Sequence, residues 1–213
     1  MAAAPPKDAP QLYLITPAGA RASELGPLLT LAMDRVTPAC LRIPGTGDET
    51  ELGRIADLVR DLAHQRDIAV VIDDHIALAQ RHGLDGVHLT DGARTVRYAR
   101  KELGADAIIG AYCGNSRHDG MNAGEGGADY VAFGPVGDSV LGRGAPVELE
   151  LFEWWSEVIE VPVVAEGAIT AGLIAQIAPI CDFIAIGPEI WGEDDPAGAL
   201  ADLWAAVTEA TSD

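Results

Sequence analysis

Two adjacent carboxylates, Asp73 and Asp74, directly follow the apolar run at residues 70–72. The run has the length and β-branched composition of a buried strand, and a short helical pattern and a second strand, residues 86–89, come next. Ligands of α/β folds bind where parallel strands end, so both carboxylates are placed to hold a metal ion or to move a proton. The alternative is that they cap the short helix.

The rest of the chain repeats this arrangement, because β-rich runs alternate with segments whose apolar residues follow helical spacing. Eight such units in 213 residues predict an α/β fold, a single (β/α)8 TIM barrel with a closed, parallel, eight-stranded sheet. An open doubly wound sheet is the alternative, but regular units without a GxGxxG motif favour closure. The predicted strands are residues 12–15, 40–43, 69–72, 86–89, 107–110, 130–133, 161–165 and 183–186.

Six of the helices have a candidate N-cap residue, and residues 75–81 and 149–159 form the other two. No change of composition divides the chain, so we expect one barrel domain at 11–213 after a disordered leader at 1–10. The candidate caps are Ser23, Asp48, Thr95, Ser116, Thr170 and Asp195.

Composition limits the partners and the compartment. With 33 acidic and 14 basic residues the formal net charge is −19, which argues against nucleic acid and against an anionic membrane surface as partners. The cysteines Cys40, Cys113 and Cys181 lie far apart and form no CxxC motif, as is typical of a reducing cytoplasm. We therefore expect a cytoplasmic protein with a small-molecule substrate, and leave open whether it is a homo-oligomer.

Several segments near the predicted strand ends are similar to those of one known family. They are LYLIT (12–16), Leu41-Arg42, VVIDDHIALA (70–79), DGVHL (85–89), DAIIGAYC (106–113), GADYVAFGPV (127–136) and VPVVAEGAIT (161–170). From residue 12 to about 207 the chain resembles the thiamine phosphate synthase family, including its thiazole tautomerase relatives. The resemblance implies a transferase of thiamine biosynthesis that joins an aminopyrimidine methyl pyrophosphate to a thiazole phosphate and releases pyrophosphate, with Mg²⁺ as cofactor.

The resemblance also implies roles for residues at the early strand ends. Arg42 would hold pyrophosphate, and Asp73 and Asp74 are the other candidate catalytic residues. Asp74 occupies a magnesium-ligand position of the family. The second metal carboxylate of the family falls on Ala93, so Asp91, two residues earlier, is a metal ligand only if its loop rearranges.

The later loops would bind the thiazole phosphate through backbone N–H groups. Two lysine positions of the family are Pro44 and Gly142 in this chain, and neither carries a positive charge. Glu166 and Glu189 place additional carboxylates beside the implied phosphate positions. The implied substrate-binding and phosphate-binding residues are Ser139, Arg143, Gly167 and Gly187.

Several interpretations stay open at the level of sequence. Arg42 either contacts an anion or pairs with one of the two adjacent carboxylates, and Glu166 either pairs with Arg143 or acts as a base. His88 is expected to be a buried structural residue, whereas His118 lies near the catalytic His of the tautomerase relatives. The alternative functions are a diverged tautomerase-like enzyme and a catalytically silent barrel that binds a small molecule or a partner.

Overall fold

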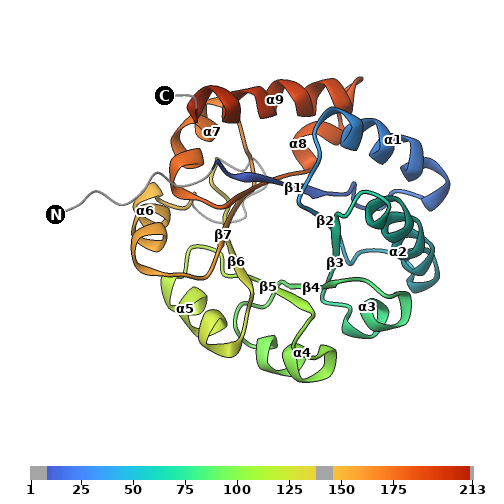
Figure 1. Ribbon diagram of the computed structural model, residues 1–213, viewed down its shortest axis with the longest axis horizontal. Coiled ribbons are helices and arrows are strands. Elements are labelled where there is room, and N and C mark those ends of the chain that lie inside the picture. Colours follow the sequence, from blue (N-terminus) through green and yellow to red (C-terminus); the bar gives the residue numbers. More distant parts are fainter. Residues whose placement is uncertain (1–8, 138–145, 212–213) are drawn as a thin grey trace.

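The computed structural model describes residues 9–137 and 146–211. Within them, eight parallel strands pair in chain order from β1 to β8, and β8 pairs with β1 to close a barrel. The strands lie at the centre and the helices surround them (Figure 1). The closed parallel sheet confirms the predicted (β/α)8 barrel and excludes the open sheet.

Four strands, β2, β4, β6 and β8, have the predicted bounds, and one short helix, α8, was not predicted. The strands are β1 (Gln11–Ile15), β2 (Cys40–Ile43), β3 (Ala69–Asp73), β4 (Gly86–Leu89), β5 (Ile108–Tyr112), β6 (Tyr130–Phe133), β7 (Val163–Glu166) and β8 (Phe183–Ile186). The helices of the described residues are α1 (Ala22–Arg35), α2 (Glu49–His64), α3 (Ile76–His82), α4 (Val96–Leu103), α5 (Arg117–Gly126), α6 (Leu149–Val158), α7 (Ala171–Ile177), the 3₁₀ turn η1 (Ala178–Ile180), α8 (Pro188–Trp191) and α9 (Pro196–Ala210).

Two strand boundaries differ from the prediction in a way that matters for the site. Asp73 is the last residue of β3 and is paired in register with His88 of β4, so it does not follow the strand. Glu166 likewise belongs to β7 and is paired with Ala185 of β8. The prediction ended both strands too early because it counted only apolar residues, whereas inward-facing positions at the mouth of a barrel can be polar.

The predicted caps are mostly correct. Ser23 is the exception, because α1 already begins at Ala22, whose N–H group donates to Glu51 of α2 at 2.8 Å. A side chain from another helix therefore accepts a hydrogen bond at the start of α1, in place of a local cap. Thr95 holds the N-cap position of α4 without a side-chain hydrogen bond. Confirmed caps, each accepting from a backbone N–H group of its helix, are Asp48, Ser116, Thr170 and Asp195.

The interior of the barrel is a packed core separate from the one between strands and helices. It is narrow at Gly110 on β5, where an added Cβ atom would lie 2.0 Å from Cζ of Tyr130. The tyrosine ring thus fills the volume that a side chain on β5 would need. The buried members of this inner core are Tyr13, Cys40, Val71, Tyr130, Ala132, Val164 and Ala185.

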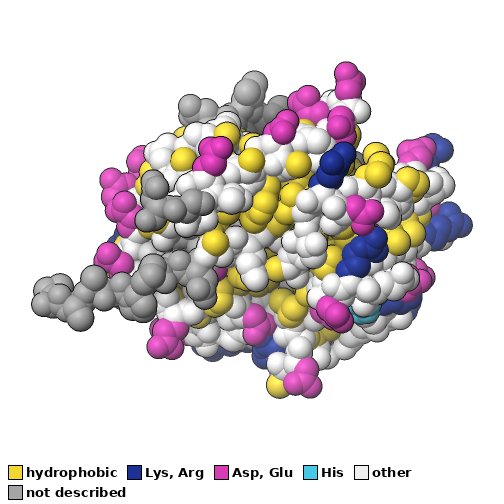
Figure 2. All heavy atoms as spheres, turned by 45° about the horizontal axis from the view of Figure 1, so that its top comes forward, with side chains coloured by type: hydrophobic (Ala, Val, Ile, Leu, Met, Phe, Trp, Pro, Cys, Tyr) yellow, Lys and Arg dark blue, Asp and Glu magenta, His cyan; other side chains and the backbone are white. Residues whose placement is uncertain are grey.

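The described surface agrees with the acidic composition. On the face drawn in Figure 2, acidic side chains are spread around the molecule while the Lys and Arg side chains gather toward one side. No helix among the described residues has both the length and the apolar character needed to cross a bilayer. Residues 1–8 of the predicted leader lie outside the described residues, so the leader stays a prediction.

Candidate active site

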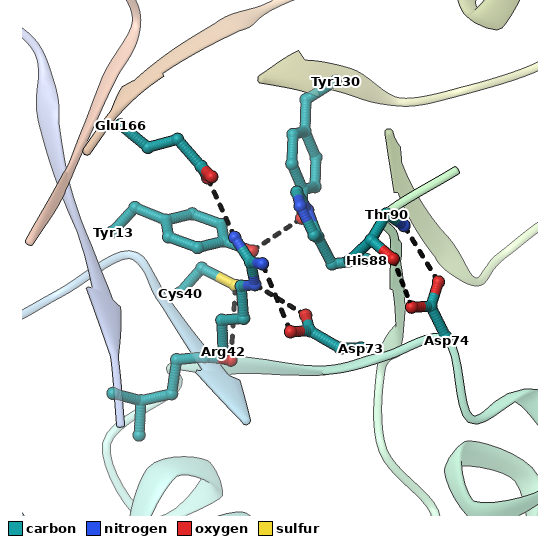
Figure 3. A network of polar contacts seen from close by, with 10 residues as sticks. Tyr13, Cys40, Arg42, Asp73, Asp74, His88, Thr90, Tyr130 and Glu166 are labelled. Atoms are coloured by element: carbon teal, nitrogen blue, oxygen red, sulfur yellow. Dashed lines mark hydrogen bonds and ion pairs between the residues drawn. The ribbon is translucent and has the colours of Figure 1, made fainter. Parts of the chain in front are cut away.

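The inner face of the barrel carries a buried ion cluster at the carboxyl ends of its strands. Arg42 of β2 forms a two-pronged contact with Asp73 of β3, from Nε to Oδ1 at 2.6 Å and from Nη2 to Oδ2 at 3.2 Å. Its Nη1 atom donates to Oε2 of Glu166, on β7, at 2.8 Å. Figure 3 shows the guanidinium group between the two carboxylates. The three side chains are only 10–15% exposed, so water screens these contacts little.

Burial and charge act against each other in this cluster. Burial alone would lower the pKa of Arg42, but the carboxylates of Glu166 and Asp73 outweigh it and raise the pKa above its ordinary value. Arg42 is therefore cationic at neutral pH. Burial raises the pKa of Asp73 and of Glu166, and the charge of Arg42 opposes that change. When both acids are ionised, the cluster has one positive and two negative charges, so the net charge at this site is negative.

The raised pKa of Glu166 predicts a pH dependence of stability. Folding favours its neutral form, so the stability it contributes is complete below the ordinary carboxyl pKa and is lost as pH rises through the raised value. A Glu166→Gln variant has no carboxyl group at this position, so its stability does not fall for this reason as pH rises. Its free energy of unfolding is expected to increase relative to that of the wild type as pH rises from about 4 toward neutral.

Urea unfolding at a series of pH values measures this difference. Glu193→Gln, at an exposed carboxylate near α8, is the matched control for the change of charge alone. The opposite sign of the pH dependence would mean that attraction to Arg42 outweighs the burial of Glu166.

A neutral hydrogen-bonded chain lies beneath the ion cluster. The hydroxyl groups of Tyr13 and Tyr130 are 2.6 Å apart, and Nδ1 of His88 lies 3.0 Å from the hydroxyl of Tyr130. Burial, together with the charge of Arg42, lowers the pKa of His88 well below its ordinary value, so this side chain is neutral. The structural interpretation of His88 agrees with its complete burial. Sequence reasoning missed both tyrosines, although each is an aromatic residue within a predicted strand.

Asp74 lies on the exposed side of the same edge. Its carboxylate accepts hydrogen bonds from the backbone N–H group of Thr90, at 2.9 Å, and from the Thr90 hydroxyl group. These contacts connect the end of β3 to the loop after β4 (Figure 3). Asp74 has a φ of 54°, in the left-handed region that non-glycine residues rarely adopt. The side chain of Asp74 is therefore held in place by a neighbouring loop.

The described residues do not form a ready-made magnesium site. Asp91 accepts a hydrogen bond from the hydroxyl group of Thr95. Both carboxylate oxygens of Asp74 accept hydrogen bonds from Thr90, and Asp73 forms an ion pair with Arg42. Within residues 9–137 and 146–211, no three His, Cys, Asp or Glu side chains are grouped so that they could hold a metal ion. A magnesium ion would have to take most of its ligands from elsewhere, as this ion commonly does from substrate phosphates and water.

A cleft of about 530 Å³ is lined in part by Thr90, the residue that is hydrogen-bonded to Asp74. It contains one cationic side chain, Arg94, and the carboxylates of Asp91 and Asp119. The loops after β4 and β5 and the first turns of α5 form its walls. Its lining residues are Thr90, Asp91, Gly92, Ala93, Arg94, Tyr112, Cys113, Gly114, Asp119 and Asn122.

In the loops after β6 and β7, some backbone N–H groups are hydrogen-bonded to the chain itself. The carbonyl oxygen of Gly167, which has a φ of +88°, accepts from the N–H groups of Val136 and Gly137 at 3.1 Å. Gly187 is packed against β1, because an added Cβ atom would lie 2.7 Å from Cβ of Ile15. Packing therefore suffices to explain this glycine. The other two implied phosphate-binding residues, Ser139 and Arg143, lie outside the described residues.

The structure decides three of the alternatives that the sequence left open. The N-cap residue of α3 is His75, without a side-chain hydrogen bond, so Asp73 and Asp74 do not cap this helix. Arg42 forms an ion pair with Asp73, which was one of its two open interpretations, and a second ion pair with Glu166, which the sequence did not indicate. His118 lies on the exposed side of α5, where its Nε2 atom is 3.0 Å from the amide nitrogen of Asn122.

Known proteins share this sequence and this fold. Residues 12–190 match the family described as thiamine monophosphate synthase. The chain belongs to this family. A thiamine-phosphate synthase of Rhodospirillum centenum is 42% identical over 202 residues, covering 91% of this chain and 95% of the relative. Its counterpart in Erythrobacter litoralis is 40% identical over 198 residues, covering 90% and 92%.

Among solved structures, a thiamine phosphate pyrophosphorylase from Pyrococcus furiosus superposes with a TM-score of 0.80. The two chains are 24% identical, and the match covers 95% of this chain and 97% of the other, which shows a shared fold. Membership in the thiamine monophosphate synthase family confirms the resemblance found in the strand-end motifs. The matched segment runs from β1 into α8 and so contains both the ion cluster and Glu189.

Proposed function

We propose that this chain is a transferase of thiamine biosynthesis that joins an aminopyrimidine methyl pyrophosphate to a thiazole phosphate and releases pyrophosphate. The observation that carries the proposal is Arg42, a buried cation held at the ligand-binding end of a barrel that belongs to this family. All three cysteines are buried thiols, which supports a location in the reducing cytoplasm.

When the coupling begins, positive charge develops on the pyrimidine methylene and negative charge on the departing pyrophosphate. The C–O bond between the pyrimidine methylene and pyrophosphate breaks with its electron pair on pyrophosphate, and the thiazole nitrogen then forms a C–N bond to the methylene carbon. Positive charge develops on the methylene carbon, where the carboxylates of Asp73 and Glu166 would stabilise it when both are ionised. A guanidinium group has five N–H donors and these contacts use three, which leaves Arg42 donors for the departing pyrophosphate.

Magnesium remains part of the proposal as a prediction. Asp74 is exposed at this edge and does not pair with Arg42, and the family position of the second carboxylate is Ala93. No step above depends on the ion. Assays with and without Mg²⁺, with a chelator in the second set, test whether the chain needs it.

The deciding experiment is a coupling assay with both precursors and Mg²⁺, in which released pyrophosphate and the mass of the coupled product are measured. Product that requires both precursors is the expected result. Omission of either precursor provides the control. A purified, folded chain that forms no product with any thiazole acceptor, and gives no calorimetric heat with pyrophosphate, would leave the tautomerase-like and the silent barrel as the remaining functions.

A further inference from the structure

Arg94 is an exposed cationic side chain that lines the cleft. It lies in the loop between β4 and α4, at the edge of the barrel where the strands end. Within residues 9–137 and 146–211, its guanidinium group has no hydrogen bond and no ion pair. Asp91 and Asp119 line the same cleft, but neither carboxylate is paired with Arg94. The N–H donors of Arg94 are therefore available to a ligand.

Positive charge is scarce at this end of the barrel. In the described parts of the loops that follow the eight strands, the only Lys or Arg residues are Arg21 and Arg94. Arg21 precedes α1 and is close enough to Glu51 of α2 to interact with its charge. Arg117, the first residue of α5, lies over the ring of Trp154, 4.1 Å from its centre. Among these cations only Arg94 lines the cleft.

The buried cation Arg42 is surrounded by negative charge. Its guanidinium group is paired with Asp73 and with Glu166, so the ion cluster is negative overall when both acids are ionised. Pyrophosphate is a multiply charged anion, and these carboxylates repel it unless further positive charge is present. A second guanidinium group would supply that charge, and its planar N–H donors suit the oxygen atoms of a phosphate group.

A short series of contacts connects the cleft to the ion cluster. Thr90 lines the cleft, and its backbone N–H group donates to Asp74 at 2.9 Å. Asp74 directly follows Asp73, whose carboxylate is paired with Arg42. The strands that lead to these residues, β3 and β4, are neighbours in the sheet. The cleft volume of about 530 Å³ is within the usual range for small-molecule sites.

We infer that Arg94 binds the pyrophosphate group of the pyrimidine substrate and supplies positive charge that Pro44 and Gly142 do not carry. This inference rests on the proposed coupling function. The C–O bond breaks with its electron pair on pyrophosphate, and Arg94 donates hydrogen bonds to that group without transferring a proton. Because two carboxylates also line the cleft, we expect pyrophosphate to bind there together with Mg²⁺, an ion that commonly accompanies phosphates in proteins.

Calorimetric titration of pyrophosphate, with excess Mg²⁺, into the purified full chain is the first test. Arg94→Gln is expected to bind pyrophosphate at least about tenfold more weakly than the wild type, because charge-assisted hydrogen bonds are lost. Arg97→Gln removes an exposed arginine of α4 that does not line the cleft, and should bind as the wild type does. Arg94→Lys keeps the charge without the planar donors and should lie between the two.

Steady-state coupling kinetics are the second test. Arg94→Gln should lower kcat/KM for the pyrimidine substrate by at least about tenfold, whereas KM for the thiazole phosphate should change by less than about threefold. The comparison of the two substrates distinguishes a contact with pyrophosphate from a contact with the phosphate of the acceptor. Since Arg94 is exposed and unpaired among the described residues, the thermal midpoint of the variant should equal that of the wild type.

Four outcomes overturn the inference. They are no pyrophosphate binding by the wild type, equally tight binding by Arg94→Gln, an equal weakening in Arg97→Gln, and a kinetic effect confined to the thiazole phosphate. The failure of the proposed function is a different result. It would appear as no coupling by the wild type, while the pyrophosphate titrations would still decide the role of Arg94.

Discussion

An Arg42→Met variant is expected to lose about 3–5 kcal/mol of its free energy of unfolding at neutral pH, because it leaves two buried carboxylates without their partner. Asp73 and Glu166 are 12% and 15% exposed, and both pair with this guanidinium group. Burial already raises the pKa of each, so without Arg42 the cost of their ionised forms increases further. Urea unfolding at constant pH measures the loss.

Two controls separate this effect from a general loss of charge. Arg54→Met removes an arginine from an exposed pair with Glu51, where the Arg54 side chain is 68% exposed, and should cost less than about 1 kcal/mol. A triple variant, Arg42→Met with Asp73→Asn and Glu166→Gln, should regain a large part of the stability because no unpaired charge stays buried. A single variant as stable as the wild type would show that water reaches the two carboxylates.

Asp74→Asn is expected to reduce kcat for coupling by about 100-fold with little change in thermal stability. The amide keeps an oxygen that can accept from the Thr90 N–H group, so the contact to the loop after β4 is preserved in part. What is lost is the negative charge next to Thr90, a lining residue of the cleft, where a cation that accompanies pyrophosphate would bind. Steady-state kinetics with both precursors, together with the thermal midpoint, separate this loss from misfolding.

Asp91→Asn is the matched variant for Asp74→Asn. Asp91 lines the same cleft, but its carboxylate is bonded to Thr95 at the start of α4, so kcat should change by less than about threefold. An equal loss in both variants, accompanied by a higher requirement for Mg²⁺, would make Asp91 the second metal ligand. If Asp74→Asn reduces kcat by less than about threefold, Asp74 has no role in the proposed reaction.

The barrel itself was predictable from the sequence, because its signals are local. Short apolar runs alternate with helical spacing, and capping residues such as Asp48, Ser116 and Thr170 begin their helices as predicted. The position of Asp73 and Asp74 at the ligand-binding edge also followed, since the carboxyl ends of parallel strands all face the same side. The strand-end motifs further gave the family, which the comparisons confirm.

The contacts that decide the chemistry were not readable from the sequence. Arg42 and Glu166 are 124 residues apart on β2 and β7, which are not neighbours in the sheet. Their contact arises only because the sheet closes and because its stagger brings both side chains to the same height inside the barrel. The carboxylate of Glu189 likewise meets Ile169 only when two loops from separate strands come together. Periodicity determines which face a residue occupies, whereas closure of the barrel determines which residue it meets there.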